Sequence, residues 1–138
     1  MRIRPIRLLA IATALSLPFV LGCGGAKTYP VEGIVVYKDG TPVTGGIVTF
    51  ELVGDGPAKE CARGEIGPDG TFQLRTFARN DGALAGKHRV IVAPPPALGK
   101  SASPTESIHP RFANYDTSGL QFTVTSGKNH FRIEVERP

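Results

Sequence analysis

Residues 31–53 read VEGIVVYKDGTPVTGGIVTFELV, and their residue pattern is the clearest indication of the fold class. Residues 31–38 and 46–53 are rich in β-branched and aromatic side chains, which favour β-strands. In the second segment Val48, Phe50 and Leu52 alternate with more polar residues, so one face should enter a core. Asp39-Gly40 supplies the positive φ of a tight turn between the two segments. The stretch therefore predicts two strands joined as a hairpin.

The same pattern of short strand-forming segments separated by turn residues continues to the end of the chain. Five more short strands are predicted, at residues 60–66, 71–76, 86–93, 120–125 and 130–136. The turn sequences Gly67-Pro68-Asp69-Gly70 and Ser126-Gly127-Lys128-Asn129 predict two further hairpins. No helical periodicity competes with this pattern. We therefore expect an all-β fold, a seven-stranded antiparallel β-sandwich, although periodicity alone leaves a closed barrel open.

The stretch of residues 94–119 has no strand pattern, and a long irregular connection in a small domain is often functional. His109, Arg111, Phe112 and Tyr115 give it an aromatic and cationic character suited to binding a sugar or a peptide. We treat these four residues as a candidate ligand or partner loop. The alternative is that Phe112 and Tyr115 plug the open end of the sandwich.

The first 22 residues have the layout of a signal peptide. Three arginines precede an apolar run of 15 residues, 8–22, which is shorter than the roughly 20 residues that a membrane-spanning helix needs. Val20-Leu21-Gly22-Cys23 resembles the lipobox of bacterial lipoproteins, which implies cleavage between Gly22 and Cys23 and lipid attachment to the Cys23 thiol. We expect a signal peptide at 1–22, a lipidated cysteine with a flexible tether at 23–30 and a sandwich domain at 31–138.

The charge and the cysteine content bear on the expected partners and on disulfide bonding. Removing residues 1–22 would take away three of 16 basic residues and none of 12 acidic ones, so the net charge would fall from +4 to +1. Nucleic acid is therefore not an expected partner. With Cys23 committed to lipid, Cys61 has no partner for an internal disulfide, and we interpret it as a small strand residue.

The sequence also resembles a known family. Residues 31–50, Gly67-Pro68-Asp69-Gly70-Thr71-Phe72 and Gly86-Lys87-His88-Arg89-Val90-Ile91-Val92 are similar to the opening segments of carboxypeptidase-regulatory-like domains. Taken whole, the chain resembles the small planctomycete-type lipoproteins that carry such a domain. The resemblance implies a transthyretin-like, Ig-like sandwich and no known reaction.

The remaining polar residues do not assemble into a catalytic motif in the sequence. His88, His109 and His130 lack a ligand spacing, and the C-terminal Tyr-Arg-Gly-Ser of transthyretin-like hydrolases is missing. We expect no catalytic residues, no metal and no cofactor.

The expected function is that of a membrane-anchored extracytoplasmic lipoprotein, on the cell membrane or outer membrane and facing the periplasm or exterior. Its non-enzymatic sandwich would bind an extracellular protein or glycan, or serve adhesion or envelope structure. A transthyretin-like hydrolase and an accessory subunit of an envelope complex stay as alternatives, and the oligomeric state stays open.

Overall fold

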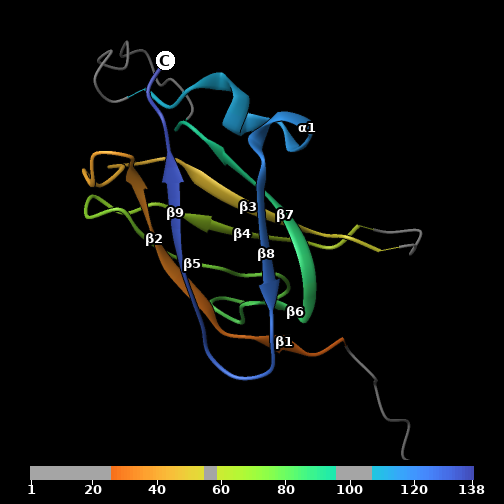
Figure 1. Ribbon diagram of the computed structural model, residues 1–138. Coiled ribbons are helices and arrows are strands. Elements are labelled where there is room, and N and C mark those ends of the chain that lie inside the picture. Colours follow the sequence, from red (N-terminus) through yellow and green to blue (C-terminus); the bar gives the residue numbers. More distant parts are fainter. Residues whose placement is uncertain (1–25, 55–58, 96–106) are drawn as a thin grey trace, which may run out of the picture.

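The computed structural model describes residues 26–54, 59–95 and 107–138. Strands dominate these residues, and the two helices are single turns (Figure 1). The elements in chain order are β1 (Thr28–Tyr29), β2 (Val31–Tyr37), β3 (Ile47–Leu52), β4 (Cys61–Glu65), β5 (Thr71–Gln73), β6 (Ala83–Leu84), β7 (Gly86–Ala93), η1 (Pro110–Ala113), α1 (Tyr115–Ser118), β8 (Leu120–Val124) and β9 (Asn129–Val135).

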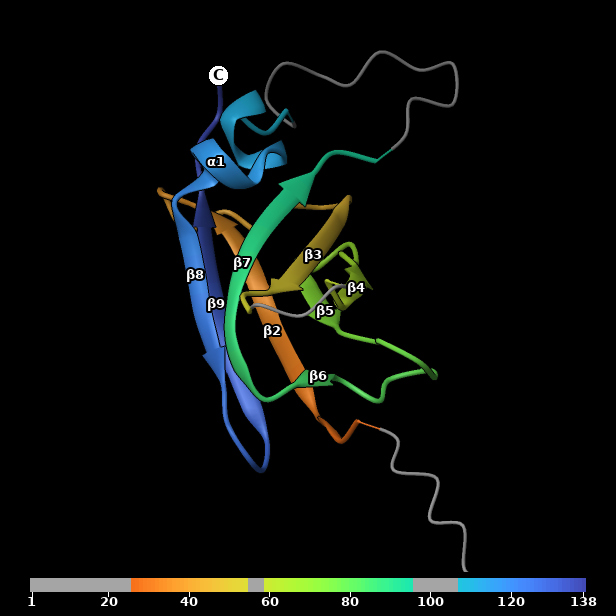
Figure 2. The same ribbon diagram turned by 90° about the vertical axis from the view of Figure 1, so that its right-hand side faces the viewer.

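Seven of the strands form two sheets that face each other. One sheet has the order β4-β3-β7-β8 and the other β5-β2-β9, while β1 and β6 form a separate two-stranded ribbon. Figure 2 shows the two sheets facing each other, with α1 at one end and β6 toward the other. The seven strands correspond one to one with those predicted from the sequence, and the all-β sandwich is confirmed.

One strand pair differs from the antiparallel expectation. The seven residues of β2 pair with β9 in parallel, from Val31 opposite Asn129 to Tyr37 opposite Val135, whereas the other strand pairs are antiparallel. This ladder joins the first and last long strands of the domain. The fold is therefore closed by contacts between residues about a hundred positions apart along the chain.

The hairpins predicted at residues 39–42 and 126–129 are wrong in their pairing. The first turn is present, with Gly40 at φ +87°, but β2 and β3 lie in different sheets. The second connects β8, which pairs with β7, to β9, which pairs with β2. In both places the chain passes from one sheet to the other. Two consecutive strands with one apolar face each can bury those faces against each other across a sandwich as well as side by side in one sheet.

The third predicted hairpin, at residues 67–70, is partly formed. The Gly67 amide donates to the Thr71 carbonyl at 2.8 Å, and Arg63 and Arg75 exchange two backbone hydrogen bonds at 2.9 Å. Between these two points β5 pairs with β2 instead of β4. The splayed hairpin leaves β4 and β5 as neighbouring edges of the two sheets.

The core is organised around Phe50, whose side chain is fully buried. Its ring centroid lies 5.9–6.4 Å from the rings of Phe72, His88, Phe122 and Phe131. These separations are typical of favourable aromatic pairs. Val48 and Phe50 on β3 and Val90 and Val92 on β7 are buried, as their alternation predicts. Two strand faces that could be identified in the sequence thus form the centre of the core.

The domain begins earlier than expected. Thr28 and Tyr29, which the sequence assigns to the flexible tether, pair with Leu84 and Ala83 of β6. Gly82 makes this approach possible, because its φ is +87° and a Cβ atom there would lie 1.7 Å from the Tyr29 carbonyl oxygen. The described chain is therefore held to the sandwich from Thr28 onward.

Candidate functional site

The part of the candidate loop that the structure describes, residues 107–119, forms a cap on one end of the sandwich, whereas residues 96–106 of the predicted loop lie outside the described residues. Phe112 is 2 % exposed and belongs to the core. The Arg111 guanidinium lies over its ring at 4.1 Å, and Nη2 of Arg111 donates to Glu136 Oε1 at 3.1 Å. His109 caps η1 by accepting the Arg111 amide on Nδ1 at 3.2 Å. Phe112 thus fills the open end of the sandwich, which is the alternative to ligand binding given above.

Tyr115 is also held within this cap. The Arg89 guanidinium lies 5.0 Å from the centre of its ring, and Arg89 in turn pairs with Glu51 through Nη2 and Oε1 at 2.5 Å. Burial, with neighbouring Cys61 and Glu51, raises the pKa of Tyr115 to about 12, so the phenol stays protonated near neutral pH. The structure therefore brings the four candidate residues to one end of the domain but engages each with its neighbours.

The three histidines lie on three different elements, His88 on β7, His109 at the start of η1 and His130 on β9. His88 is buried on β7, with Nδ1 3.0 Å from the Gly86 carbonyl oxygen, whereas His130 is exposed on β9. Burial lowers the pKa of His88 and outweighs the opposing hydrogen bond to Gly86, so the imidazole is neutral near pH 7. Within the described residues, no group of three or more His, Cys, Asp or Glu side chains has the arrangement of a metal site.

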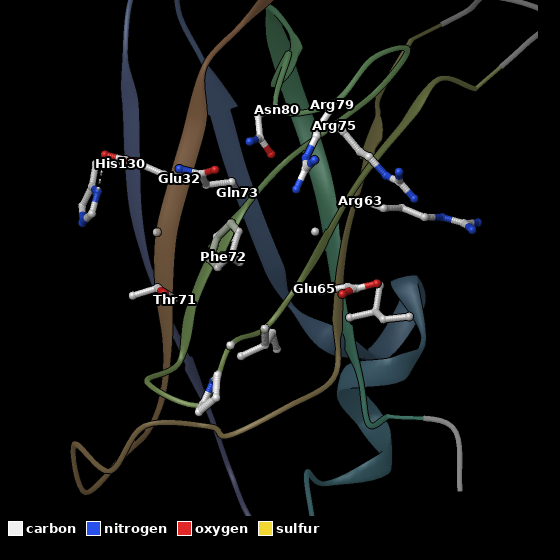
Figure 3. Close-up of a pocket in the computed structure, with 16 residues that line it drawn as sticks. Glu32, Arg63, Glu65, Thr71, Phe72, Gln73, Arg75, Arg79, Asn80 and His130 are labelled. Carbon is white, nitrogen blue, oxygen red and sulfur yellow. Dashed lines mark ion pairs between the residues drawn. The ribbon is translucent and has the colours of Figure 1, made fainter. Parts of the chain in front are cut away.

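A different surface shows an open groove of about 1220 Å³ where the edges of the two sheets meet. Its lining comes mostly from β2, β4, β5, the turn at residues 67–70 and the loop at residues 76–82, with Ile47 of β3 and His130 of β9. Figure 3 shows Arg63, Arg75 and Arg79 gathered at one end of this groove, with Glu32 and His130 on the opposite side. The groove is therefore polar and electrostatically uneven.

A smaller hollow of about 440 Å³ adjoins the arginine end of the groove. We call it the arginine hollow, and it is lined by Cys61, Arg63, Arg75, Thr76, Phe77, Ala78 and Arg79. These lining residues include three arginines and no acidic residue. In the described part of the chain, none of the three arginines forms an ion pair, whereas Arg89, Arg111 and Arg137 do. The hollow therefore concentrates positive charge that the described carboxylates leave uncompensated.

The rim of the hollow is held rigidly by Asp81. Its carboxylate accepts the backbone amides of Thr76 at 2.7 Å and of Phe77 and Ala78 at 3.0 Å. Burial opposes ionisation of Asp81, but these hydrogen bonds outweigh it and lower the pKa of the carboxyl group. The loop consequently presents Phe77 with 60 % of its surface exposed.

Sequence reasoning missed the arginine hollow, although one signal was available. Arg63 and Arg75 lie six positions before and after Asp69, the centre of the turn at residues 67–70. A hairpin in register about that turn places the two residues opposite each other, as the structure does. Phe77 and Arg79 carried no such signal, because their positions depend on the loop that Asp81 holds.

The predicted lipidation residue Cys23 and the cleavage position at Gly22 lie outside the described residues. Comparisons of the chain with protein-family models, curated proteins and solved structures find no match. None of the helices in the described ranges has the length and apolar composition needed to cross a lipid bilayer.

Proposed function

We propose that this protein is a lipid-anchored binding module of the bacterial cell envelope, attached through Cys23 to the cell membrane or the outer membrane and facing the periplasm or the exterior. The observation that carries the proposal is the short spacing between the lipobox-like cysteine and the folded domain. Four residues separate Cys23 from Thr28, where β1 begins. Even fully extended, this segment reaches at most about 18 Å, so a lipid on Cys23 would keep the sandwich at the membrane surface.

The exposed side chains of the arginine hollow favour binding over catalysis. A guanidinium group stays protonated throughout the physiological range, so it attracts anions but does not exchange protons as a general acid or base. Arg63 and Arg75 project from sheet edges that their reciprocal backbone bonds hold in place. A rigid cationic surface of this kind suits recognition of a ligand.

The anchoring part of the proposal is tested by Cys23→Ser. We expect this variant to lose labelling by an acyl-chain analogue in growing cells and to move from the membrane fraction to the soluble fraction. Two chains of lipid hold a protein on a bilayer stably, so the change in fractionation should be nearly complete. Cys61→Ser is the matched control and should leave both measurements unchanged. Acyl labelling that survives in Cys23→Ser would show that the proposed anchor is wrong.

A further inference from the structure

Two arginines of the arginine hollow lie opposite each other, an arrangement that does not stabilise the fold. Arg63 and Arg75 are a directly opposed cross-strand pair, joined by two backbone hydrogen bonds of 2.9 Å. Like charges in this position repel each other and destabilise a sheet. Arg79 adds a third positive charge to the same hollow. An anionic ligand bound between these side chains would relieve the repulsion.

The backbone geometry restricts what kind of ligand can bind. A peptide that adds a strand to a sheet edge needs free amide and carbonyl groups along that edge. At Arg63 both groups are already bonded to Arg75, so strand addition is blocked at the centre of the positive charge. The ligand must therefore be recognised through side chains. Each guanidinium offers a planar set of donors that matches a carboxylate.

Phe77 adds an apolar surface beside these charges. Its ring is largely exposed, and the three amide hydrogen bonds to Asp81 fix the loop that carries it. A flat aromatic ring next to cationic groups suits a ligand whose rings have one apolar face and carry carboxylates. Uronic-acid sugars have both features.

We propose that the arginine hollow binds an acidic polysaccharide, with carboxylates of its sugar units on Arg63, Arg75 and Arg79 and one sugar ring against Phe77. Glu32 and Glu65 line the adjoining groove and repel carboxylates, so the hollow is the part of this surface that suits acidic sugars. This inference rests on the proposed function in one respect, namely that the domain meets polymers of the cell envelope.

The proposal is tested with the full-length protein, purified in a neutral detergent from whichever cell fraction contains it. Polygalacturonate is the acidic probe, dextran the neutral one and poly-glutamate the acidic polypeptide, with binding followed by biolayer interferometry at low and moderate salt. We expect binding of polygalacturonate that weakens with salt and no binding of dextran. Arg63→Gln with Arg75→Gln should weaken binding at least tenfold, and Phe77→Ala severalfold.

Lys128→Gln with Arg132→Gln is the matched control, because it also removes two positive charges, and both residues are exposed and do not line the groove or the hollow. An equal loss of binding in this control would mean that net charge alone is responsible, and it would overturn the proposal. Tighter binding of poly-glutamate, or of phosphatidylglycerol vesicles, than of polygalacturonate would overturn it in favour of an acidic protein or a lipid surface.

A further outcome concerns the sheet edges. If Arg63→Gln with Arg75→Gln increases self-association and leaves polygalacturonate binding unchanged, the arginines serve to block edge-to-edge pairing, and the proposal is wrong. Acyl labelling of Cys23 is measured separately, so failure of the anchor and failure of the polysaccharide site can be told apart.

Discussion

His88 should make the stability of the domain depend on pH in the mildly acidic range. The side chain is 1 % exposed and its ring lies 5.9 Å from that of Phe50. Burial lowers its pKa from the ordinary value of 6.5, while the hydrogen bond with Gly86 raises it by less. The folded protein therefore holds the imidazole neutral at pH values where the unfolded chain takes up a proton. Acidification should favour unfolding.

The size of the effect follows from proton linkage. The contribution of His88 is complete above pH 6.5, and it is lost as the pH falls through 6.5 toward the lower pKa of the folded state. The free energy of unfolding should therefore be lower at pH 5.5 than at pH 7.5, by at most about 1.4 kcal/mol, which is the limit for protonation of one imidazole in the unfolded chain alone. For a domain of this size, that limit corresponds to a fall in Tm of at most roughly 11 °C.

Urea unfolding at pH 5.5, 6.5 and 7.5 measures this loss, and the comparison with His88→Phe isolates its source. Phenylalanine keeps a ring against Phe50 but cannot titrate, so the variant should lose the pH dependence whatever its absolute stability. His130→Ala, at an exposed position, should keep it. Glu51 and Asp81 have pKa values lowered by their partners and titrate below this window. A wild-type loss that persists in His88→Phe would refute the reasoning.

Three further substitutions test other parts of the structure. Phe112→Ala should lower the free energy of unfolding by about 3–5 kcal/mol because it empties a core position, and a loss below about 1 kcal/mol in urea unfolding would contradict the capping role. Gly82→Ala should separate β1 from β6, seen as faster hydrogen exchange of the amides in these two strands; unchanged exchange would contradict the close approach at Gly82. Asp81→Ala should release the loop that carries Phe77 and accelerate exchange of the Phe77 amide, whereas protection equal to wild type would show that the carboxylate does not hold the loop.

The positions of the strands could be predicted because they depend on local pattern. Alternation in β3 and β7 identifies the faces that are buried, and glycine, proline and aspartate mark the ends of the segments. The pairing of the strands could not be predicted in the same way. Asp39-Gly40 specifies that the chain reverses, but it does not specify whether the next strand joins the same sheet or the opposite one. The parallel ladder between β2 and β9 has no local signal at all.

The candidate sites show the same limit: the sequence gives the residue types of a site but not the distant partners of those residues. The residue types at His109, Arg111, Phe112 and Tyr115 suit binding, yet the same types suit a cap. Phe112 fills the core, and Arg111 pairs with Glu136 across 25 positions of sequence. Residue type alone cannot separate these roles, since the difference lies in which partners are present. Arg63 and Arg75 illustrate the converse, because each is an ordinary exposed strand residue until the splayed hairpin places them together without a described acidic partner. Unpartnered charge, visible only in three dimensions, is therefore the observation on which the proposed binding site rests.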